Sequence, residues 1–177
     1  MNNEFKNFGK EIKIFPSTVF INKQNISIGD YSHIDDFVFF NGGKKTSIGR
    51  NVHISAFTSI IGGGELIMED FSGLSAGCRI ITGSDDFSGN SLTNLTVPKE
   101  YRNITVGSVT IGKHVILGSN VVVMPNVTIG EGCIVSAGSI VNKDLEAWSI
   151  YVGYNPKKIG TRDRVKILKL EDEFINA

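Results

Sequence analysis

The sequence predicts an all-β solenoid made of stacked three-sided coils, and a short repeat is the first observation that supports this fold. An apolar residue returns every sixth position through most of the 177-residue chain. A period this short fits neither a helix face nor a flat sheet, whereas stacked coils bury such a column of side chains. The column residues are Ile28, Ile34, Phe40, Ile48, Ile54, Ile60, Met68, Leu74, Ile80, Ile111, Leu117, Val123, Ile129, Val135 and Val141.

Interruptions of the repeat are the second observation. Phe40 to Ile48 and Ile60 to Met68 each span eight residues, with glycines between them that can adopt turn angles other residues avoid. The third interruption runs from Ile81 to Thr110 and is longer than a packing connection needs. Each interruption follows the third column residue of a coil, so we expect all three at one corner. Long loops on rigid scaffolds often carry functional sites.

The elements follow in order within a single domain, 1–177, which is long enough for a continuous core. Residues 1–27 are expected to form an irregular or short-stranded cap. Coils then cover 28–145, interrupted by a loop over 83–105, and residues 146–177 close the solenoid. Within this last part, apolar residues of segment 165–174 recur at helical spacing. We expect a short amphipathic helix there, packed over the solenoid or over a neighbouring subunit.

Composition excludes several classes of partner. The formal net charge is zero and charged residues make up 20% of the chain, so no basic surface for nucleic acid is expected. The N-terminus lacks an apolar run of signal-peptide length, and no stretch is long enough to span a bilayer. We therefore expect a cytoplasmic protein without membrane insertion. Cys78 and Cys133 each lie four residues after a column residue and are interpreted as small buried fillers.

The repeat resembles that of the hexapeptide-repeat acyltransferases over about residues 26–160. Segment 151–158 is similar to the family's glycine-asparagine-proline closure, with Tyr154 inserted between the glycine and the asparagine. The resemblance implies a left-handed parallel β-helix, usually a homotrimer with active sites between subunits. It also implies transfer of an acetyl group from acetyl-coenzyme A (acetyl-CoA), without a metal ion. The loop segment 84–101 resembles sugar O- and N-acetyltransferases of nucleotide-sugar, surface-polysaccharide and lipopolysaccharide pathways.

Three histidines are available for acid–base chemistry. Acyl transfer from a thioester requires loss of an acceptor proton, stabilisation of the carbonyl oxygen and alignment of the reactants. His33 and His53 lie twenty residues apart and should stack on one outward face. The resemblance favours His53, because some relatives carry a histidine at this repeat position. His114 is the second candidate base and is expected to point outward near the return of the loop. The alternative is that all three histidines are ordinary surface residues without a catalytic role.

Asp85 departs from the family pattern. The resemblance places a histidine base at this loop position in the sugar and drug O-acetyltransferases. A carboxylate with a pKa of about 4 is a poor base for a hydroxyl, whereas an amine loses its own proton more easily. The departure therefore favours N-acetylation of an aminosugar, nucleotide-linked, with Asp85 or Asp86 orienting the amine. The alternative is that these carboxylates only bind backbone amides of a turn.

The remaining site residues are predicted from position and resemblance. Acceptor contacts are expected in the loop, where Arg102 could bind a diphosphate; the set is Ser84, Asp86, Asn94, Tyr101 and Arg102. The resemblance implies that coenzyme A lies in a groove between adjacent solenoids, along the late coils. The matching positions are Gly118, Ser119, Ala137, Gly138, Asn142, Lys143, Lys157 and Lys158. Small residues at coil corners are also what tight coiling requires.

Three other functions stay open. A sugar O-acetyltransferase would use His53 or His114 as its base. A zinc enzyme resembling the β-helix carbonic anhydrases would need three converging histidines, but no two histidines here show the close spacing of that family. A scaffold without catalysis is the third alternative, and the polar loop argues against it.

Overall fold

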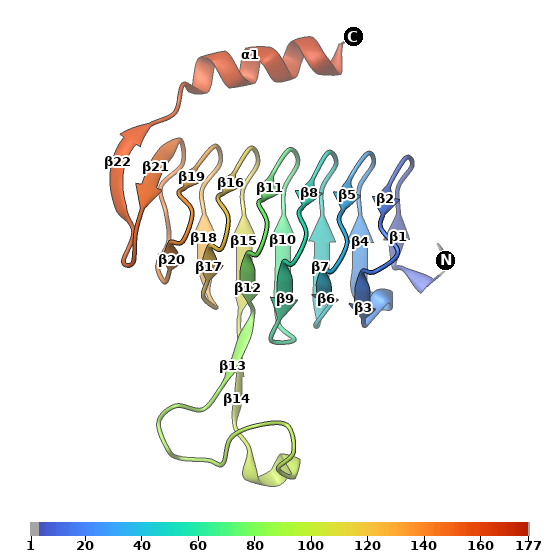
Figure 1. The fold of residues 1–177 in the computed structure, drawn as a ribbon, viewed down its shortest axis with the longest axis vertical. Helices are drawn as coiled ribbons and strands as arrows, with labels where there is room; N and C mark the ends of the chain where they lie inside the picture. The colour runs from blue at the N-terminus through green and yellow to red at the C-terminus, as the bar shows by residue number, and fades with distance from the viewer. Residues whose placement is uncertain (1–3, 177) are drawn as a thin grey trace.

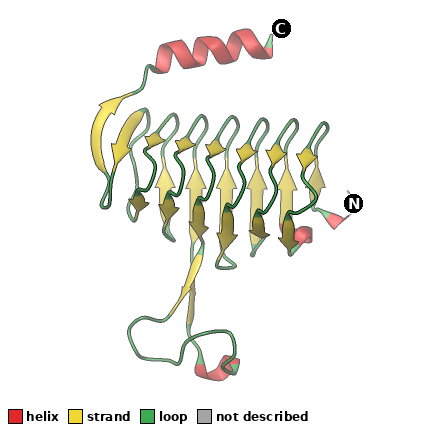
Figure 2. Ribbon diagram, viewed as in Figure 1, coloured by secondary structure: helices red, strands yellow, loops and turns green. Residues whose placement is uncertain are grey.

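Three parallel sheets form the sides of a triangular solenoid in the computed structural model, which describes residues 4–176 (Figures 1 and 2). Each coil contributes one strand to each sheet. Sheet A contains β1 (Asn7–Phe8), β4 (Ile26–Ile28), β7 (Lys45–Ile48), β10 (Glu65–Met68), β15 (Ser108–Ile111) and β18 (Val127–Ile129). Sheet C contains β3 (Val19–Ile21), β6 (Phe39–Asn41), β9 (Ser59–Ile61), β12 (Arg79–Ile81), β17 (Val122–Val123) and β20 (Ile140–Val141).

Sheet B lies between these two in the course of each coil. It contains β2 (Lys13–Ile14), β5 (His33–Ile34), β8 (His53–Ile54), β11 (Gly73–Leu74), β16 (Ile116–Leu117), β19 (Ile134–Val135), β21 (Ser149–Val152) and β22 (Lys157–Thr161). Its last pair, β21 and β22, is antiparallel. This hairpin ends the stack of parallel strands at the C-terminal side.

The core is the predicted apolar column. All fifteen column residues named above are buried, and neighbouring coils pair them directly, as in Ile34 with Ile54 and Leu74 with Leu117. Cys78 and Cys133 are free and buried among them, which confirms their interpretation as fillers. Removal from water raises the pKa of the Cys133 thiol to about 12. Both thiols therefore stay protonated at neutral pH.

The corner between sheets C and A carries all three insertions, as predicted. Residues 42–44 and 62–64 make short turns there, and residues 82–107 leave the same corner as the long loop (Figure 1). A Cβ atom at Gly62 would lie 2.1 Å from the backbone nitrogen of Gly83, and its φ of +105° also favours glycine. The loop starts as an antiparallel hairpin of β13 (Gly83–Asp85) and β14 (Ile104–Val106), and contains the short helix η3 (Lys99–Tyr101).

The coils begin earlier than the sequence analysis expected. Strands β1, β2 and β3 pair in parallel with β4, β5 and β6, so most of the expected cap 1–27 is one more coil, followed by the turn η2 (Lys23–Asn25). The missed signal is the spacing of Phe8, Ile14 and Phe20, again six residues apart. Phe5 closes this end, with its ring centroid 5.2 Å from those of Phe8 and Phe20.

Helix α1 (Arg164–Ile175) confirms the expected C-terminal helix and runs along the turns that join sheets A and B (Figure 1). Its first turn is capped by Asp163, which accepts a hydrogen bond from the backbone N–H of Lys166. Ile167 and Leu168 are half-buried, whereas Phe174 is 56% exposed. Within residues 4–176 no helix is long and apolar enough to cross a membrane.

Candidate active site

The outward face of sheet B brings candidate residues from successive coils into two columns. One column contains Lys13, His33, His53, Gly73, Ile116 and Ile134, each paired in register with the next. The second column follows the strand ends and contains Asp35, Ser55, Ser75, Gly118 and Ser136, held by backbone hydrogen bonds to the following coil. The face thus joins polar groups of the early coils to small residues of the late coils.

Asp35 connects the two histidines of this face. Its carboxylate oxygens lie 3.2 Å from the Nε2 atoms of both His33 and His53. The His33 ring also stacks on Phe15, with the centroids 5.2 Å apart. His53 is the more accessible of the two, with 53% of its side chain exposed. The carboxylate fixes the orientation of an accessible imidazole, an arrangement suited to proton exchange with a bound acceptor.

The two loop carboxylates differ in their surroundings. Asp85 ends β13, is half-buried and pairs with Ile104 across the hairpin. Asp86 accepts hydrogen bonds from the hydroxyl and backbone N–H of Ser88, and these bonds hold its pKa below the usual value. A further bond comes from the Ser91 hydroxyl. The turn-forming interpretation therefore applies to Asp86, while Asp85 is the carboxylate that stays available to a ligand. The Ser84 hydroxyl donates to the Asp85 carbonyl oxygen.

The loop carries an open surface pocket of about 570 Å³. Arg102 lines it, and within residues 4–176 the buried Nε and Nη1 atoms of this side chain have no hydrogen-bond partner. Buried guanidinium nitrogens without partners are costly, so Arg102 is a candidate to bind an anion once its side chain turns toward the pocket. Tyr101 also lines the pocket and is largely exposed. Asn94 instead shapes the loop backbone, because its φ is +73° and its side chain accepts a hydrogen bond from Thr96.

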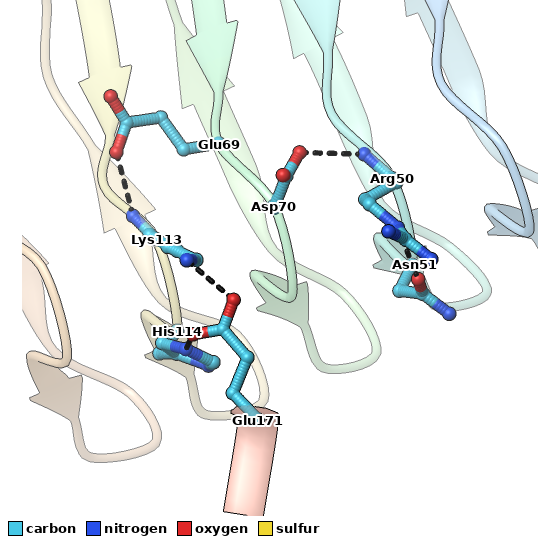
Figure 3. Close-up of polar contacts among 7 residues, drawn as sticks. All are labelled: Arg50, Asn51, Glu69, Asp70, Lys113, His114 and Glu171. Carbon is cyan, nitrogen blue, oxygen red and sulfur yellow. Dashed lines mark hydrogen bonds and ion pairs between the residues drawn. The ribbon is translucent and has the colours of Figure 1, made fainter. Parts of the chain in front are cut away.

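His114 does not occupy the outward position expected for it. It lies at the turn between β15 and β16, only 8% exposed and beneath α1 (Figure 3). Its Nε2 is 2.8 Å from a carboxylate oxygen of Glu171, and its ring stacks on Phe71 at 5.2 Å. This corner joins sheets A and B, whereas the loop returns at the corner between sheets C and A. The geometry therefore gives His114 a role in holding the helix.

Glu171 is the partner through which α1 binds this corner. Its carboxylate also pairs with the ammonium group of Lys113 (Figure 3). Burial alone would raise the pKa of Glu171, but the hydrogen bonds from Lys113 and His114 outweigh it and bring that pKa below its usual value. Phe174 adds an edge contact to Phe71, with the centroids 6.0 Å apart.

The residues expected to bind coenzyme A separate into three places. At the turns from sheet B to sheet C, the N–H of Gly138 donates to the Ser119 carbonyl at 2.8 Å. A Cβ atom at Gly118 would lie 2.5 Å from the backbone nitrogen of Ala137, so the two coils pack closely here. Gly118, Ser119, Ala137 and Gly138 thus form a corner without large side chains, called the smooth corner below. Asn142, followed by Lys143, lies at the corner between sheets C and A and donates to Asn155. Lys157 and Lys158 belong to β22, where Lys158 pairs with Glu146 at 2.7 Å.

Comparison with known proteins decides the family. Residues 108–143 match the family model "Bacterial transferase hexapeptide (six repeats)". The chain is 40% identical over 171 residues to the dTDP-4-amino-4,6-dideoxy-D-glucose acyltransferase of Escherichia coli, covering 96% of this chain and 88% of the relative. The chain belongs to the hexapeptide-repeat acyltransferases. This result confirms the family and the enzyme class expected from the sequence.

Solved structures of hexapeptide-repeat acyltransferases agree with this assignment. AntD, an N-acyltransferase from Bacillus cereus in complex with dTDP and 3-hydroxybutyryl-CoA, is 41% identical, with a TM-score of 0.91 over 98% of this chain and 92% of that chain. A hexapeptide-repeat acetyltransferase from Vibrio cholerae is 20% identical, with a TM-score of 0.62 over 92% of this chain and 77% of that chain, and shares the fold. The predicted left-handed parallel β-helix with a protruding loop and a C-terminal helix is confirmed.

Sequence reasoning missed several residues of the sheet B face in this acyltransferase. Asp35, Gly73 and Ser75 were not singled out, although Asp35, Ser55 and Ser75 are spaced twenty residues apart like the two histidines. That spacing is one coil plus a two-residue insertion. Following it along the chain would have placed all three serine and aspartate side chains beside His53.

Proposed function

We propose that this enzyme is a CoA-dependent N-acyltransferase that acylates the amino group of a dTDP-linked 4-amino-4,6-dideoxy sugar. The main support is the 40% identity to the E. coli enzyme over 96% of the chain. Further support comes from AntD, which has been crystallised with dTDP-4-amino-4,6-dideoxyglucose and coenzyme A. The missing loop histidine agrees with an amine acceptor, because an amine needs a weaker base than a hydroxyl.

Asp85 is proposed to orient the amine, with Ser75 on the opposite wall of the site. Structures of AntD include variants at a serine and variants at an aspartate ten positions farther along its chain. In the present chain a serine is followed ten residues later by an aspartate only at Ser75 and Asp85. Ser75 lies one coil from His53 on sheet B. This match supports Asp85 and Ser75 as neighbours of the reacting groups.

A homotrimer with intersubunit sites is proposed from the positions of these residues. Asp85 leaves the solenoid at the corner between sheets C and A. His53 and Ser75 lie on sheet B, the side of the triangle opposite that corner. A loop that points away from sheet B of its own subunit can meet sheet B of a neighbour. Closed rings of identical subunits repeat such a contact at every interface.

The substrates are assigned to separate parts of this intersubunit site. We infer that the pantetheine of CoA runs along the smooth corner of Gly118, Ser119, Ala137 and Gly138, where small side chains leave room for it. The loop pocket with Arg102 is proposed to hold the diphosphate, which a guanidinium binds with two parallel hydrogen bonds. The amine nitrogen then attacks the thioester carbonyl carbon, the carbon–sulfur bond breaks, and the net transfer of the amine proton to sulfur gives an amide and the free thiol.

The cellular role follows from the proposed substrates. Nucleotide-linked sugars and acyl-CoA are both made in the cytoplasm, so we place the reaction there. A deoxysugar acylated while attached to a nucleotide is a donor for surface-polysaccharide assembly.

A thiol-release assay tests the proposed function. Purified enzyme is mixed with an acyl-CoA and either dTDP-4-amino-4,6-dideoxyglucose or its matched 4-hydroxy analogue, and the product is identified by mass spectrometry. Release with the amino form and not with the hydroxy form is expected. Release with the hydroxy form alone would overturn the proposal in favour of O-acylation, with His53 then the candidate base.

A further inference from the structure

The histidine and isoleucine column of sheet B has a gap at Gly73. This residue lies between His53 and Ile116 in direct register. A Cβ atom built at Gly73 would meet no other heavy atom within 4 Å, and its φ is not in the left-handed region. Gly118 differs, because a Cβ there would lie 2.5 Å from neighbouring backbone. The fold requires glycine at 118 but does not require it at 73.

The gap is bounded by groups of different polarity. His53 stands on one side with an accessible imidazole, and Ile116 stands on the other with 41% of its surface exposed. Adjacent parallel strands lie about 4.8 Å apart, so the strands of these two residues are separated by about 9.6 Å. That width admits an alkyl chain. The small residues Ser136, Gly118 and Ser75 form a continuous column beside the gap.

We propose, building on the proposed function, that the gap at Gly73 holds the acyl group beyond its second carbon and that Gly73 determines acyl-chain length. The smooth column leads from the corner assigned to pantetheine toward His53, so the thioester arrives beside the gap. Ile116 provides an apolar wall for a third and fourth carbon, while His53 and Ser75 can pair with a hydroxyl on the third carbon. The substrate class is therefore a short-chain acyl-CoA longer than acetyl-CoA, with room for a 3-hydroxyl group.

Substitution of Gly73 tests this inference with the whole enzyme. The ratio kcat/KM is measured for acetyl-, butyryl- and 3-hydroxybutyryl-CoA at saturating aminosugar nucleotide. We expect the wild type to use the four-carbon donors at least as well as acetyl-CoA. Gly73→Val should lower kcat/KM for both four-carbon donors by about tenfold or more, and that for acetyl-CoA by less than about twofold. Gly73→Ala should give intermediate losses.

Ser47→Val is the matched control, because it adds side-chain volume at an outward strand position of sheet A, away from this face. It should leave the donor ratio unchanged, where the donor ratio is kcat/KM for a four-carbon donor divided by kcat/KM for acetyl-CoA. Thermal melting of each variant reports folding, and Gly73→Ala provides the donor ratio if the valine variant does not fold. Equal losses for all three donors, or no change in their ratio, would overturn the inference. If the wild type acylates a hydroxy acceptor instead, the proposed function fails, but the donor ratio is still measured on that acceptor.

Discussion

At the scale of single residues, Asp35 is the side chain of the candidate site that lies between the two histidines of sheet B. One carboxylate contacts both rings at 3.2 Å. A substitution at Asp35 therefore changes the orientation of His53 without removing the imidazole. His33 shares the same carboxylate but is farther from the small-residue column of the late coils. Substitution of His33 therefore serves as a control for the same substitution at His53.

His53→Ala should lower kcat by about a hundredfold, because the variant loses the proposed general acid–base group. Asp35→Asn should lower kcat by about tenfold, since the ring remains but loses its charged partner. His33→Ala is the control and should retain most of the turnover. Steady-state kinetics and thermal melting separate chemistry from folding. Equal kcat values for wild type and His53→Ala would remove His53 from the site.

Asp85 and Asp86 form a second natural comparison. Asp85→Asn should lower kcat/KM for the aminosugar nucleotide by about a hundredfold, because the charge proposed to orient the amine is lost. Asp86→Asn removes the same charge one residue later but keeps an oxygen that accepts the Ser88 hydrogen bonds. The decrease in kcat/KM for Asp86→Asn should stay below about threefold. The KM for acyl-CoA should change in neither variant, and a selective rise in that constant would contradict the assignment.

Helix α1 is held at the scale of elements by a charged corner rather than by a deep apolar contact. None of its residues is fully buried, and Glu171 provides bonds to both Lys113 and His114. The pKa of Glu171 is lowered from 4.5 in the folded protein. Its contribution to docking is therefore fully present at pH values above about 5 and is lost as the pH falls through the lowered pKa.

Glu171→Gln should weaken docking of α1 by about 1–2 kcal/mol, because a charge-assisted hydrogen bond becomes neutral. Amide hydrogen exchange in α1 should accelerate, while exchange in the coils stays unchanged. Trp148 is the single tryptophan of the chain and lies 6.3 Å from His114 between ring centroids, so its fluorescence reports on this corner. Acidification from pH 6 to pH 3 should change that signal in the wild type and much less in the variant.

The elements that could be predicted from the sequence are those that depend on residues close together in the chain. The column from Ile28 to Val141 repeats every coil, so sequence alone identified the solenoid, its insertions and its buried cysteines. The first coil was missed although Phe8, Ile14 and Phe20 keep the six-residue spacing and Phe40, equally aromatic, was counted in the column. The burial of His114 could not be predicted, since its partners Phe71 and Glu171 lie 43 and 57 residues away and meet it only through folding.

At the scale of the whole molecule, the proposed site combines residues from two different subunits. The loop and the outward face of sheet B lie on opposite sides of the same solenoid. Each proposed site therefore combines Asp85 of one subunit with His53 of its neighbour. This division makes the oligomer testable through activity.

Co-expression of Asp85→Asn and His53→Ala subunits in equal amounts should restore activity that neither variant has alone. With random assembly, about one quarter of the interfaces would join an intact loop to an intact sheet B, giving about one quarter of wild-type activity. Analytical ultracentrifugation should show a trimer for each protein. Mixed samples with no more activity than the separate variants would place both residues within one subunit's site.

The long loop interrupts the chain without interrupting the sheets. Strands β10, β11 and β12 before it pair with β15, β16 and β17 after it, as closely as any other neighbours. The N–H of Gly107 donates to the carbonyl oxygen of Thr82, so the two ends of the insertion are already joined. Insertions and deletions between these ends leave the rest of the scaffold unchanged. A change within this segment is therefore expected to alter the proposed acceptor contacts while it leaves the coils proposed to bind the acyl donor in place.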